Sequence, residues 1–168
     1  ETLKGLEGTA LFNVYGPTEA TIWSTSAQLN GARLTIGTPL IDEDVLILSP
    51  FGKIVPIGVW GEICVGGQGL ARGYWKRPDL TNEVFITHPV RSGERIYRTG
   101  DLGRFYPDGR LQCGGRMDNQ VKVRGYRIEL GEIEQTLLQV SGVREAVAHI
   151  VEIDGLNEVA AYLVCDEG

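Results

Sequence analysis

The sequence predicts an α+β fold, in which a β-rich, barrel-like unit is followed by a small βαββ module. From about residue 34 to residue 112, short runs of β-forming residues alternate with glycine-rich turns, which is typical of antiparallel barrels. After residue 118 the pattern changes to a helical period and two long alternating runs. Glycine, at 23 of 168 residues, is about twice as frequent as in an average protein. No Gly-X-Y period accompanies it, so collagen is excluded and a compact fold with many tight turns is expected.

The β-rich unit is predicted strand by strand, from apolar runs and the turns that end them. A first predicted strand, residues 10–15, precedes the unit, and the strands of the unit itself are residues 45–48, 53–55, 62–65, 104–106 and 110–112. Gly16 and Pro17 end the first of these strands. Residues 107–109, Pro-Asp-Gly, predict a hairpin turn between the last two strands. Residues 49–52 predict a second hairpin between the second and third strands.

The module after residue 118 begins with a predicted strand at residues 120–124. Apolar residues then recur at intervals of three and four, which predicts a helix of about three turns through Leu130, Ile133, Leu137 and Val140. Gly142 suits the end of that helix. A half-buried strand is predicted from the alternation of Val143, Glu145, Val147, His149 and Val151. Asp154 and Gly155 turn the chain, and residues 159–164 return as the last strand.

The change of pattern places a domain boundary between residues 117 and 118. Residues 1–28 are predicted as a strand and loop, and residues 29–117 as the barrel-like unit. Residues 118–168 form the βαββ module, which is of marginal size for an independent domain. Asp118 stands at the boundary and is therefore either a hinge or an ordinary linker residue.

Composition and charge argue against several classes of protein. The net charge of −6 argues against general nucleic-acid binding. The longest apolar runs fall far short of the roughly 20 residues that a membrane-spanning helix needs. The three cysteines lack CxxC spacing, which argues against a zinc site or a disulfide framework and favours a reduced, cytoplasmic setting. We therefore expect neither a nucleic-acid nor a membrane partner.

Residues 91–127 differ in charge from the rest of the chain. They contain nine basic and four acidic residues, a local excess of +5. Such runs are usually solvated faces, and a site for a small anionic ligand is the alternative.

Three polar clusters end apolar runs and are candidates for chemistry, at residues 13–19, 97–101 and 114–120. In the first, the ring of Tyr15 can stack on a base, and Glu19 can hold a magnesium ion beside phosphates. In the second, Asp101 can accept hydrogen bonds from the diol of a ribose. In the third, Arg116 can contact phosphate or ribose oxygens. The alternative for each cluster is an ordinary turn with structural side chains.

Together the clusters resemble the motifs of one family, the adenylation domains of nonribosomal peptide synthetases. These belong to the adenylate-forming enzymes, with the acyl-CoA synthetases and luciferase. Residues 13–19 resemble the NxYGPTE motif, and residues 61–74 resemble GELxIGGxGLARGY. Residues 97–102 resemble YRTGDL, and residues 115–134 resemble GRxDxQVKxRGxRIELGEIE. The four motifs stand in family order, and the resemblance covers essentially the whole chain.

The resemblance implies a site for ATP or AMP. Tyr15 is similar to the residue that stacks on adenine, with Asn13 near the same base and Gly16 beside it. Asp101 matches the ribose-binding aspartate, and Arg116 matches the arginine next to it.

The resemblance also implies catalytic and substrate-binding positions. Thr18 and Glu19 match the residues that contact phosphate and Mg²⁺, with Glu19 as the metal ligand. Val14, Ile22 and Trp23 fall at positions that line the pocket for the amino-acid side chain.

The resemblance also implies that the chain is one segment of a larger enzyme with two parts. Residues 1–117 would be the C-terminal portion of a large core, and residues 118–168 the first part of a mobile subdomain. Asp118 matches the hinge of that subdomain, and Gly125 lies where the family builds a tunnel for the pantetheine arm.

The implied function of the parent is amino-acid activation in nonribosomal peptide synthesis. The parent would form aminoacyl-AMP and transfer it to the phosphopantetheine thiol of a peptidyl carrier protein. A condensation domain of the same assembly line is a further implied partner. In this family a lysine-containing triphosphate loop lies upstream of Asn13 and an NGK-type lysine motif lies downstream of Gly168, so these residues alone are expected to be inactive.

Two alternatives remain at this point. The first is an acyl- or aryl-CoA ligase, although Pro17 and residues 127–134 look more like the peptide-synthetase branch. The second is a non-catalytic structural or docking module. The presence of all four candidate ligand-binding side chains argues against this second alternative; they are Tyr15, Glu19, Asp101 and Arg116.

Overall fold

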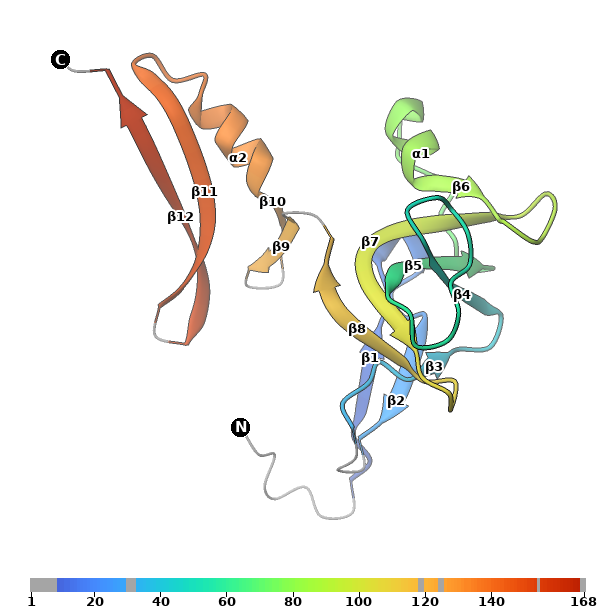
Figure 1. Cartoon of the computed structure of the whole chain (residues 1–168). Coiled ribbons are helices and arrows are strands. Elements are labelled where there is room, and N and C mark those ends of the chain that lie inside the picture. Colours follow the sequence, from blue (N-terminus) through green and yellow to red (C-terminus); the bar gives the residue numbers. More distant parts are fainter. Residues whose placement is uncertain (1–8, 30–32, 118–119, 124–125, 154, 167–168) are drawn as a thin grey trace. The chain divides into compact units, whose positions relative to one another are not determined.

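The residues described by the computed structural model are 9–29, 33–117, 120–123, 126–153 and 155–166 (Figure 1). The chain divides into two compact units, unit 1 with residues 1–117 and unit 2 with residues 118–168. Within the described ranges, neither helix has both the length and the apolarity needed to cross a membrane.

Unit 1 begins with a small antiparallel sheet. β1 (Phe12–Tyr15) pairs with β2 (Thr25–Gln28), which pairs in turn with β3 (Thr38–Pro39). A 3-10 helix, η1 (Thr18–Ala20), lies between β1 and β2. Because β1 and β2 are antiparallel neighbours, the loop that contains η1 leaves and re-enters the sheet at the same end.

The larger sheet of unit 1 is antiparallel, with strand order β4-β5-β7-β6 and with β8 paired to β7. Its elements, with the helix that precedes β6, are β4 (Glu43–Leu48), β5 (Gly61–Gly67), α1 (Pro78–Val84), β6 (Phe85–Thr87), β7 (Arg95–Phe105) and β8 (Leu111–Arg116). In Figure 1, β7 curves strongly, and it pairs with β5, β6 and β8 along its length. The curled sheet confirms the predicted β-rich, barrel-like part of an α+β fold, whereas α1, β6 and the part of β7 before residue 104 were not predicted.

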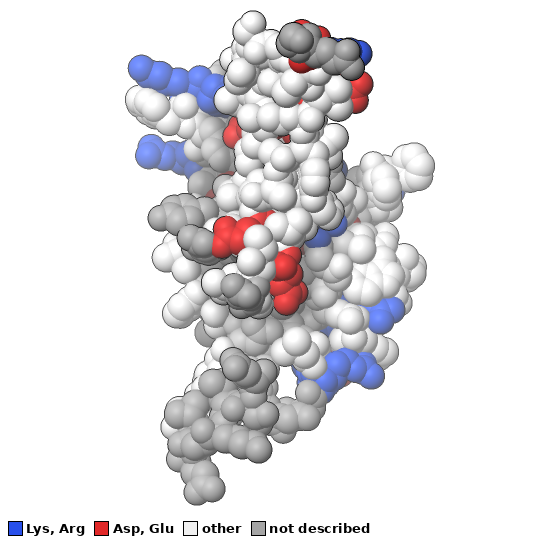
Figure 2. Space-filling model, turned by 90° about the vertical axis from the view of Figure 1, so that its left-hand side faces the viewer, with Lys and Arg blue, Asp and Glu red and all other residues white. Residues whose placement is uncertain are grey.

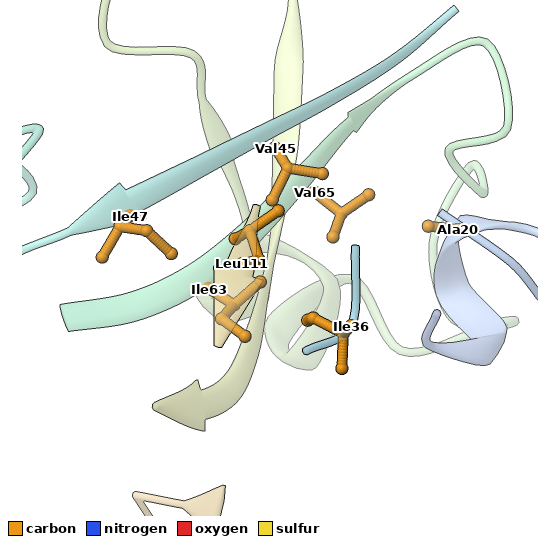
Figure 3. Close-up of a cluster of buried hydrophobic side chains, with 7 residues drawn as sticks. All are labelled: Ala20, Ile36, Val45, Ile47, Ile63, Val65 and Leu111. Atoms are coloured by element: carbon orange, nitrogen blue, oxygen red, sulfur yellow. The ribbon is translucent and has the colours of Figure 1, made fainter. Parts of the chain in front are cut away.

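β5 is buried on both faces because core side chains cover each of them. Ile63 and Val65 belong to one apolar cluster, and Cys64 belongs to another. The first cluster, shown in Figure 3, comprises Ala20, Ile36, Val45, Ile47, Ile63, Val65 and Leu111. Ala20 comes from η1, so burial of apolar surface fixes the β1–β2 loop against the larger sheet.

The two predicted hairpins have different outcomes. The turn at residues 107–109 joins β7 to β8, with Gly109 at a φ of 81°, a backbone conformation that glycine adopts without strain. The turn after β4 brings Ile54 back to a single bridge with Leu48, and the Val55 N–H donates a hydrogen bond of 3.0 Å to the Ile47 carbonyl. The second hairpin is therefore present, with its returning strand reduced to one bridge residue, and β4 pairs along its length with β5 on its other edge.

Unit 2 contains two antiparallel pairs with a helix between them. The elements are β9 (Gln120–Val123), β10 (Tyr126–Glu129), α2 (Leu130–Leu137), β11 (Val143–Ile153) and β12 (Leu156–Cys165). β9 pairs with β10, and β11 pairs with β12. The predicted module is thus present with one additional strand, β10.

α2 is shorter than the sequence predicted. It ends at Leu137, and Val140, the last apolar position of the predicted helical face, lies beyond it and is exposed. The chain leaves the helix through successive i to i+3 hydrogen bonds, including one from the Val140 N–H to the Leu137 carbonyl. Gly142, at a φ of 88°, then directs the chain into β11.

The sequence predicted β11 from one face, which carries Val143, Glu145, Val147, His149 and Val151. The one buried residue of β11 lies on the opposite face. Ala148 is buried and Ala146 is half-buried, whereas Val147 and His149 are exposed. Glu134 Oε1 accepts a hydrogen bond of 2.9 Å from the Ala148 N–H, which links α2 to this strand. Because side chains alternate along a strand, Val147 and His149 lie on the face opposite to Ala148, and Val143 and Val151, from the same predicted set, are half-buried.

Candidate functional site

Tyr15, Asp101 and Arg116 meet in unit 1, where the end of β1 lies beside the β7–β8 pair. The Tyr15 hydroxyl donates a hydrogen bond of 2.5 Å to Asp101 Oδ2, and Arg116 Nη1 lies 3.1 Å from Asp101 Oδ1. Asp101 and Arg116 are directly opposite each other in the β7–β8 register, which explains why they meet. The structure thus brings together three residues that the sequence singled out in separate clusters.

The buried carboxylate of Glu62 lies next to this cluster and contacts β7, the strand that carries Asp101. Glu62 Oε2 accepts a hydrogen bond of 2.8 Å from Arg98 Nε, and Glu62 Oε1 accepts one of 3.0 Å from the Gly100 N–H. The β5–β7 register shifts between Glu62 and Cys64, so β7 bulges at this point. Glu62 therefore provides an acceptor for a backbone N–H beside the bulge. The hydrogen bond from Arg98 to Glu62 raises the pKa of Arg98, and the guanidinium stays charged.

Thr99 links the bulge both to β5 and to Asp101. Its hydroxyl donates a hydrogen bond of 2.7 Å to the Ile63 carbonyl and accepts one of 3.0 Å from the Asp101 N–H. The Thr99 carbonyl in turn accepts a hydrogen bond of 2.8 Å from Arg116 Nη1. The backbone that presents Asp101 is thus fixed from both sides.

The Tyr15 hydroxyl is the donor in its contact with Asp101. Burial raises the pKa of Tyr15 above its ordinary value, and the charge of Asp101 and the hydrogen bond to it raise it further. The phenol therefore stays protonated at neutral pH, because deprotonation would place a second negative charge beside the carboxylate.

Glu19 lies in η1 and is buried. Its Oε1 accepts a hydrogen bond of 2.6 Å from the Tyr74 hydroxyl, and its backbone carbonyl accepts one of 2.8 Å from the Ala71 N–H. Burial raises the pKa of Tyr74, and the hydrogen bond to Glu19 adds to this effect, so Tyr74 stays a donor. The neighbouring Thr18 is exposed at the first position of η1.

The three expected pocket residues lie on β1 and on the loop after η1. Val14 is 39% exposed, Ile22 is 67% exposed and Trp23 is 57% exposed. Gly16 lies against this loop, because a Cβ at position 16 would approach the Ile22 carbonyl oxygen to 2.5 Å and the Ser24 nitrogen to 2.7 Å. Glycine at position 16 therefore lets the loop backbone cross the end of β1 at close range.

Asn13 makes a structural contact on β1. Its Nδ2 donates a hydrogen bond of 2.7 Å to the Thr35 carbonyl, which ties β1 to the segment before β3. Asp118 and Gly125 lie outside the described residues, so the hinge and the pantetheine position stay predictions.

The basic residues that the structure describes between positions 91 and 127 contact several separate side chains. Four of these residues form ion pairs, namely Arg91 with Asp44 and Glu94, Arg98 with Glu62, Arg110 with Asp108 and Arg116 with Asp101. Arg104 instead lies over the Trp60 ring, 4.6 Å from its centroid. On the face drawn in Figure 2, basic and acidic side chains form separate small groups on a mostly uncharged surface. The excess thus serves individual contacts, one of which belongs to the Tyr15–Asp101–Arg116 cluster.

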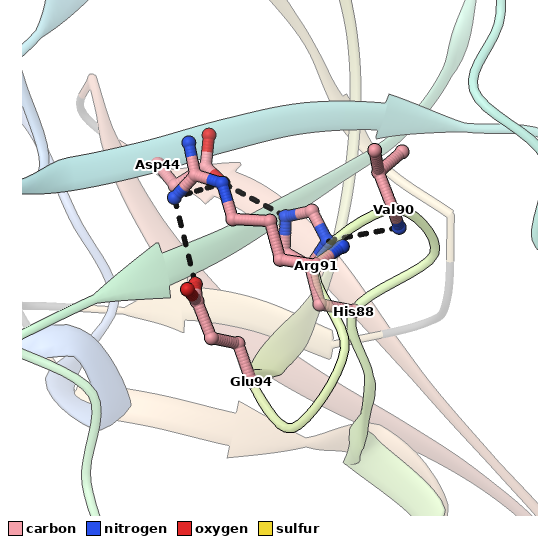
Figure 4. Close-up of polar contacts among 5 residues, drawn as sticks. All are labelled: Asp44, His88, Val90, Arg91 and Glu94. Carbon is pink, nitrogen blue, oxygen red and sulfur yellow. Dashed lines mark hydrogen bonds and ion pairs between the residues drawn. The ribbon is translucent and has the colours of Figure 1, made fainter.

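His88 is fixed by both of its ring nitrogens (Figure 4). Nε2 lies 2.8 Å from Asp44 Oδ2, and Nδ1 accepts the backbone N–H groups of Val90 and Arg91. Since Nδ1 is an acceptor, the ring proton is on Nε2 and is donated to Asp44. Both nitrogens therefore hold the loop after β6 to β4, and His88 is a structural residue.

Sequence reasoning missed Glu62, Arg98, Thr99 and Tyr74 as parts of the site. Glu62 could have been identified from the sequence, because a charged residue at the start of an apolar run on a buried strand requires a partner. Thr99 and Tyr74 lie inside the motifs, but their partners belong to distant elements and no local pattern identifies them.

Glu19 is the candidate ligand for a magnesium ion. Among the residues that the structure describes, no three His, Cys, Asp or Glu side chains are grouped to hold a metal ion. Mg²⁺ commonly takes only one or two protein carboxylates and completes its octahedral shell with water and substrate phosphates. One buried carboxylate, oriented by Tyr74, fits this requirement.

Comparison with known proteins gives consistent matches. Residues 1–75 match the family described as AMP-binding enzyme. Tyrocidine synthase 3 of Brevibacillus parabrevis is 49% identical over 160 residues, which are 94% of this chain and 2% of that protein.

Two solved structures are similar over 94% of the chain. PA1221, described as an NRPS protein containing adenylation and PCP domains, has a TM-score of 0.83 and 32% identity, and 33% of it is covered. AB3403, described as a four-domain nonribosomal peptide synthetase bound to AMP and glycine, has a TM-score of 0.62 and 45% identity, and 12% of it is covered.

The chain spans only a small part of the proteins that it matches, from 2% to 33% of the three lengths given above. The matches nevertheless extend over nearly all of the chain and confirm the resemblance that its motifs indicated. Residues 1–75 thus match the AMP-binding enzyme family, and the chain is similar along nearly its whole length to a segment of the nonribosomal peptide synthetases.

Proposed function

We propose that the chain is part of an amino-acid-activating adenylation domain, which forms aminoacyl-AMP from ATP and an amino acid. The observation that carries this proposal is the hydrogen-bonded cluster of Tyr15, Asp101 and Arg116, which come from three separate motifs. The descriptions of PA1221, with adenylation and PCP domains, and of AB3403, with AMP and glycine, support it.

In the proposed nucleotide site, Asp101 binds the ribose. Each carboxylate oxygen has two lone pairs, so Asp101 can accept hydrogen bonds from a diol in addition to those from Tyr15 and Arg116. Because Arg116 and Tyr15 already orient the carboxylate, little reorganisation is needed when the nucleotide binds. The Tyr15 ring is the proposed stacking surface for adenine, with Asn13 and Gly16 at neighbouring positions.

Thr18 and Glu19 are the proposed contacts to phosphate and Mg²⁺. The ion, when bound, would neutralise negative charge on the phosphates. Tyr74 and Ala71 hold the side chain and the carbonyl of Glu19, so the carboxylate is oriented before any ion arrives. The exposed hydroxyl of Thr18 remains accessible to a phosphate group.

In the proposed reaction, a carboxylate oxygen of the amino acid attacks the α-phosphorus of ATP while the bond to pyrophosphate breaks. The phosphopantetheine thiol of a peptidyl carrier protein then takes the aminoacyl group, and AMP leaves. Val14, Ile22 and Trp23 are the proposed lining of the amino-acid pocket. Asp118 is the proposed hinge about which the C-terminal subdomain rotates between the two steps, and Gly125 is the proposed residue beside the pantetheine arm. A neighbouring condensation domain and a cytoplasmic location belong to the same proposal.

We propose further that these 168 residues do not turn over alone. The reason is that the two lysine-containing motifs expected for the family have no counterpart in the sequence. Amino-acid-dependent pyrophosphate exchange by the isolated chain would contradict this part of the proposal.

The test of the nucleotide site is the substitution Asp101→Ala in the complete protein that carries this chain. We expect amino-acid-dependent pyrophosphate exchange to fall by about tenfold or more, because charged hydrogen bonds to the ribose are lost. Asp108→Ala is the matched control, since Asp108 pairs with Arg110 in an exposed turn. Unchanged exchange in Asp101→Ala would contradict the ribose assignment.

A further inference from the structure

The loop that carries Ile22 and Trp23 contains a strained turn. Thr21 and Ile22 have positive φ angles of 53° and 72°, a conformation that β-branched residues rarely adopt. The Trp23 N–H donates a hydrogen bond of 2.9 Å to the Thr21 carbonyl, which closes a three-residue γ-turn centred on Ile22. Such a conformation persists only where the surroundings fix it, and it is often found at functional sites.

The segment that fixes this turn is the chain after β5, residues 68–74, which we call the strap. The Thr21 hydroxyl donates a hydrogen bond of 2.5 Å to the Gly69 carbonyl of the strap. Further along the strap, the Ala71 N–H and the Tyr74 hydroxyl donate hydrogen bonds to Glu19 in η1. The strap is therefore attached on both sides of the buried Ala20, at Glu19 and at Thr21, and Thr21 is itself the first of the two residues with a positive φ.

The strap and the turn are in close contact at Gly69. A Cβ at position 69 would approach Glu43 Oε1 to 2.6 Å, and it would lie 3.4 Å from both the Ala20 carbonyl oxygen and Thr21 Cβ. Burial raises the pKa of Glu43, whereas Ser24 and the backbone of Gly69 act to lower it. The turn, the strap and β4 thus leave no free space around Gly69.

The exposed side chains of Ile22 and Trp23 have little packing of their own to orient them. Ile22 is 67% exposed and Trp23 is 57% exposed, while the backbone beneath them is held by Gly16 and the strap. The direction of both side chains is therefore set by the γ-turn. If the attachment at Thr21 is lost, the strained turn can relax toward a negative φ and both side chains move with it.

We propose that Thr21 is a positioning residue for recognition of the amino-acid substrate: its hydroxyl, bound to Gly69, holds the γ-turn that orients Ile22 and Trp23. This inference rests on the proposed function, because it takes those two side chains as part of the substrate pocket. It adds a role for the strap that neither the motifs nor the comparisons assign.

The experiment compares Thr21→Val with Thr21→Ser in the complete protein, by pyrophosphate exchange. Valine keeps the branched shape but loses the hydroxyl, whereas serine keeps the hydroxyl. We expect Thr21→Val to raise the KM for the amino acid about fivefold, the effect of one lost hydrogen bond, with the KM for ATP unchanged. Thr21→Ser should restore the KM for the amino acid to within about twofold of the original value. Across a panel of amino acids, the ranking should change in Thr21→Val only.

A second variant keeps the inference testable if Thr21→Val does not fold. Gly69→Ala would bring a methyl group to 2.6 Å from Glu43 Oε1, so the strap must shift at the residue whose carbonyl accepts the Thr21 hydrogen bond, and the KM for the amino acid should rise in the same way while Thr21 is intact. Unchanged KM values for the amino acid in the folded variants, or an equal rise for ATP, would overturn the inference. Absence of amino-acid-dependent exchange in the unmutated protein would instead contradict the proposed function itself.

Discussion

Unit 1 and unit 2 are both built mainly from antiparallel strands, but they bury them to different extents. In unit 1, β5 lies between β4 and β7, and six of its seven residues are buried. In unit 2, β12 pairs only with β11 among the described strands, and none of its residues is buried. A strand with neighbours on both edges and clusters on both faces is fixed by packing, whereas a strand in a two-stranded pair is not.

The difference explains where the candidate site lies. Tyr15, Asp101 and Arg116 are held by unit 1, where the Glu62 and Thr99 contacts fix the backbone between β5 and β7. The described part of unit 2 has fewer buried side chains, namely Val123, Leu130 and Ala148. Precise positioning of ligand-binding side chains requires a rigid scaffold, and unit 1 provides it. Four predictions test this contrast.

The largest expected effect is the loss of a core isoleucine from unit 1. Ile63→Ala should reduce the free energy of unfolding by about 2–5 kcal/mol, because Ile63 is fully buried and leaves a cavity. Ile153→Ala in unit 2 is the matched control, and since Ile153 is 54% exposed its effect should stay within about 0.5 kcal/mol. Urea unfolding of both variants measures the contrast. Equal losses would mean that the two units are packed alike.

A smaller effect is expected from the buried carboxylate of unit 1. Glu62→Ala should cost about 2 kcal/mol, because the Gly100 N–H loses its acceptor and Arg98 loses its partner. The figure is below that for a fully buried pair, since the Arg98 side chain is 43% exposed and water can solvate it. Glu62→Gln keeps an acceptor oxygen and should cost about half as much. Thermal unfolding distinguishes the two variants, and equal costs would contradict the role of the Gly100 contact.

In unit 2, the corresponding tertiary hydrogen bond should contribute less. Glu134→Ala removes the acceptor of the Ala148 N–H and should cost about 1 kcal/mol, confined to α2 and β11. Amide hydrogen exchange at Ala148 should accelerate, whereas exchange in β5 should not change. Glu134→Gln, which keeps the acceptor, should preserve most of the protection. Acceleration that spreads to β5 would show that the two units unfold together.

The smallest effect, with no expected change in stability, concerns the thiols. Burial raises the pKa of Cys64 to about 12, the charge of Glu62 adds to this and Arg98 opposes it. At pH 7–8 the thiolate of Cys64 is therefore scarce, and its alkylation should require unfolding. The exposed Cys165 of unit 2 should be alkylated first in the native protein. Mass spectrometry of alkylated peptides over time measures the order, and rapid labelling of Cys64 would mean that β5 opens readily.

Much of the fold followed from the sequence because its causes are local. The Pro-Asp-Gly turn at residues 107–109, the apolar run in β5 and the helical period from Leu130 to Leu137 all appear where they were expected. The errors lie where distant neighbours decide. The segment 53–55 keeps only one bridge to β4, and β11 buries Ala148 rather than Val147 or His149.

The candidate site was predicted in part, since its residues were identified but their contacts were not. Tyr15 and Asp101 are 86 positions apart, and no local pattern states that the hydroxyl of one reaches the carboxylate of the other. Glu62 was overlooked because its two partners lie on β7. The positive φ of Ile22 was equally hidden, since isoleucine does not favour it and it depends on contacts with Gly16 and with the distant strap.

By itself the sequence determined the fold class, the resemblance to one family and the identity of the residues available for chemistry, because motif composition, turns and apolar periods depend on near neighbours. The tertiary structure alone decided which of these residues meet. The β7–β8 register joins Asp101 to Arg116, and the packing of η1 under the strap joins Glu19 to Tyr74. The physical reason is that burial, strand register and hydrogen-bond pairing are set by contacts between distant segments, and these form only in the folded chain.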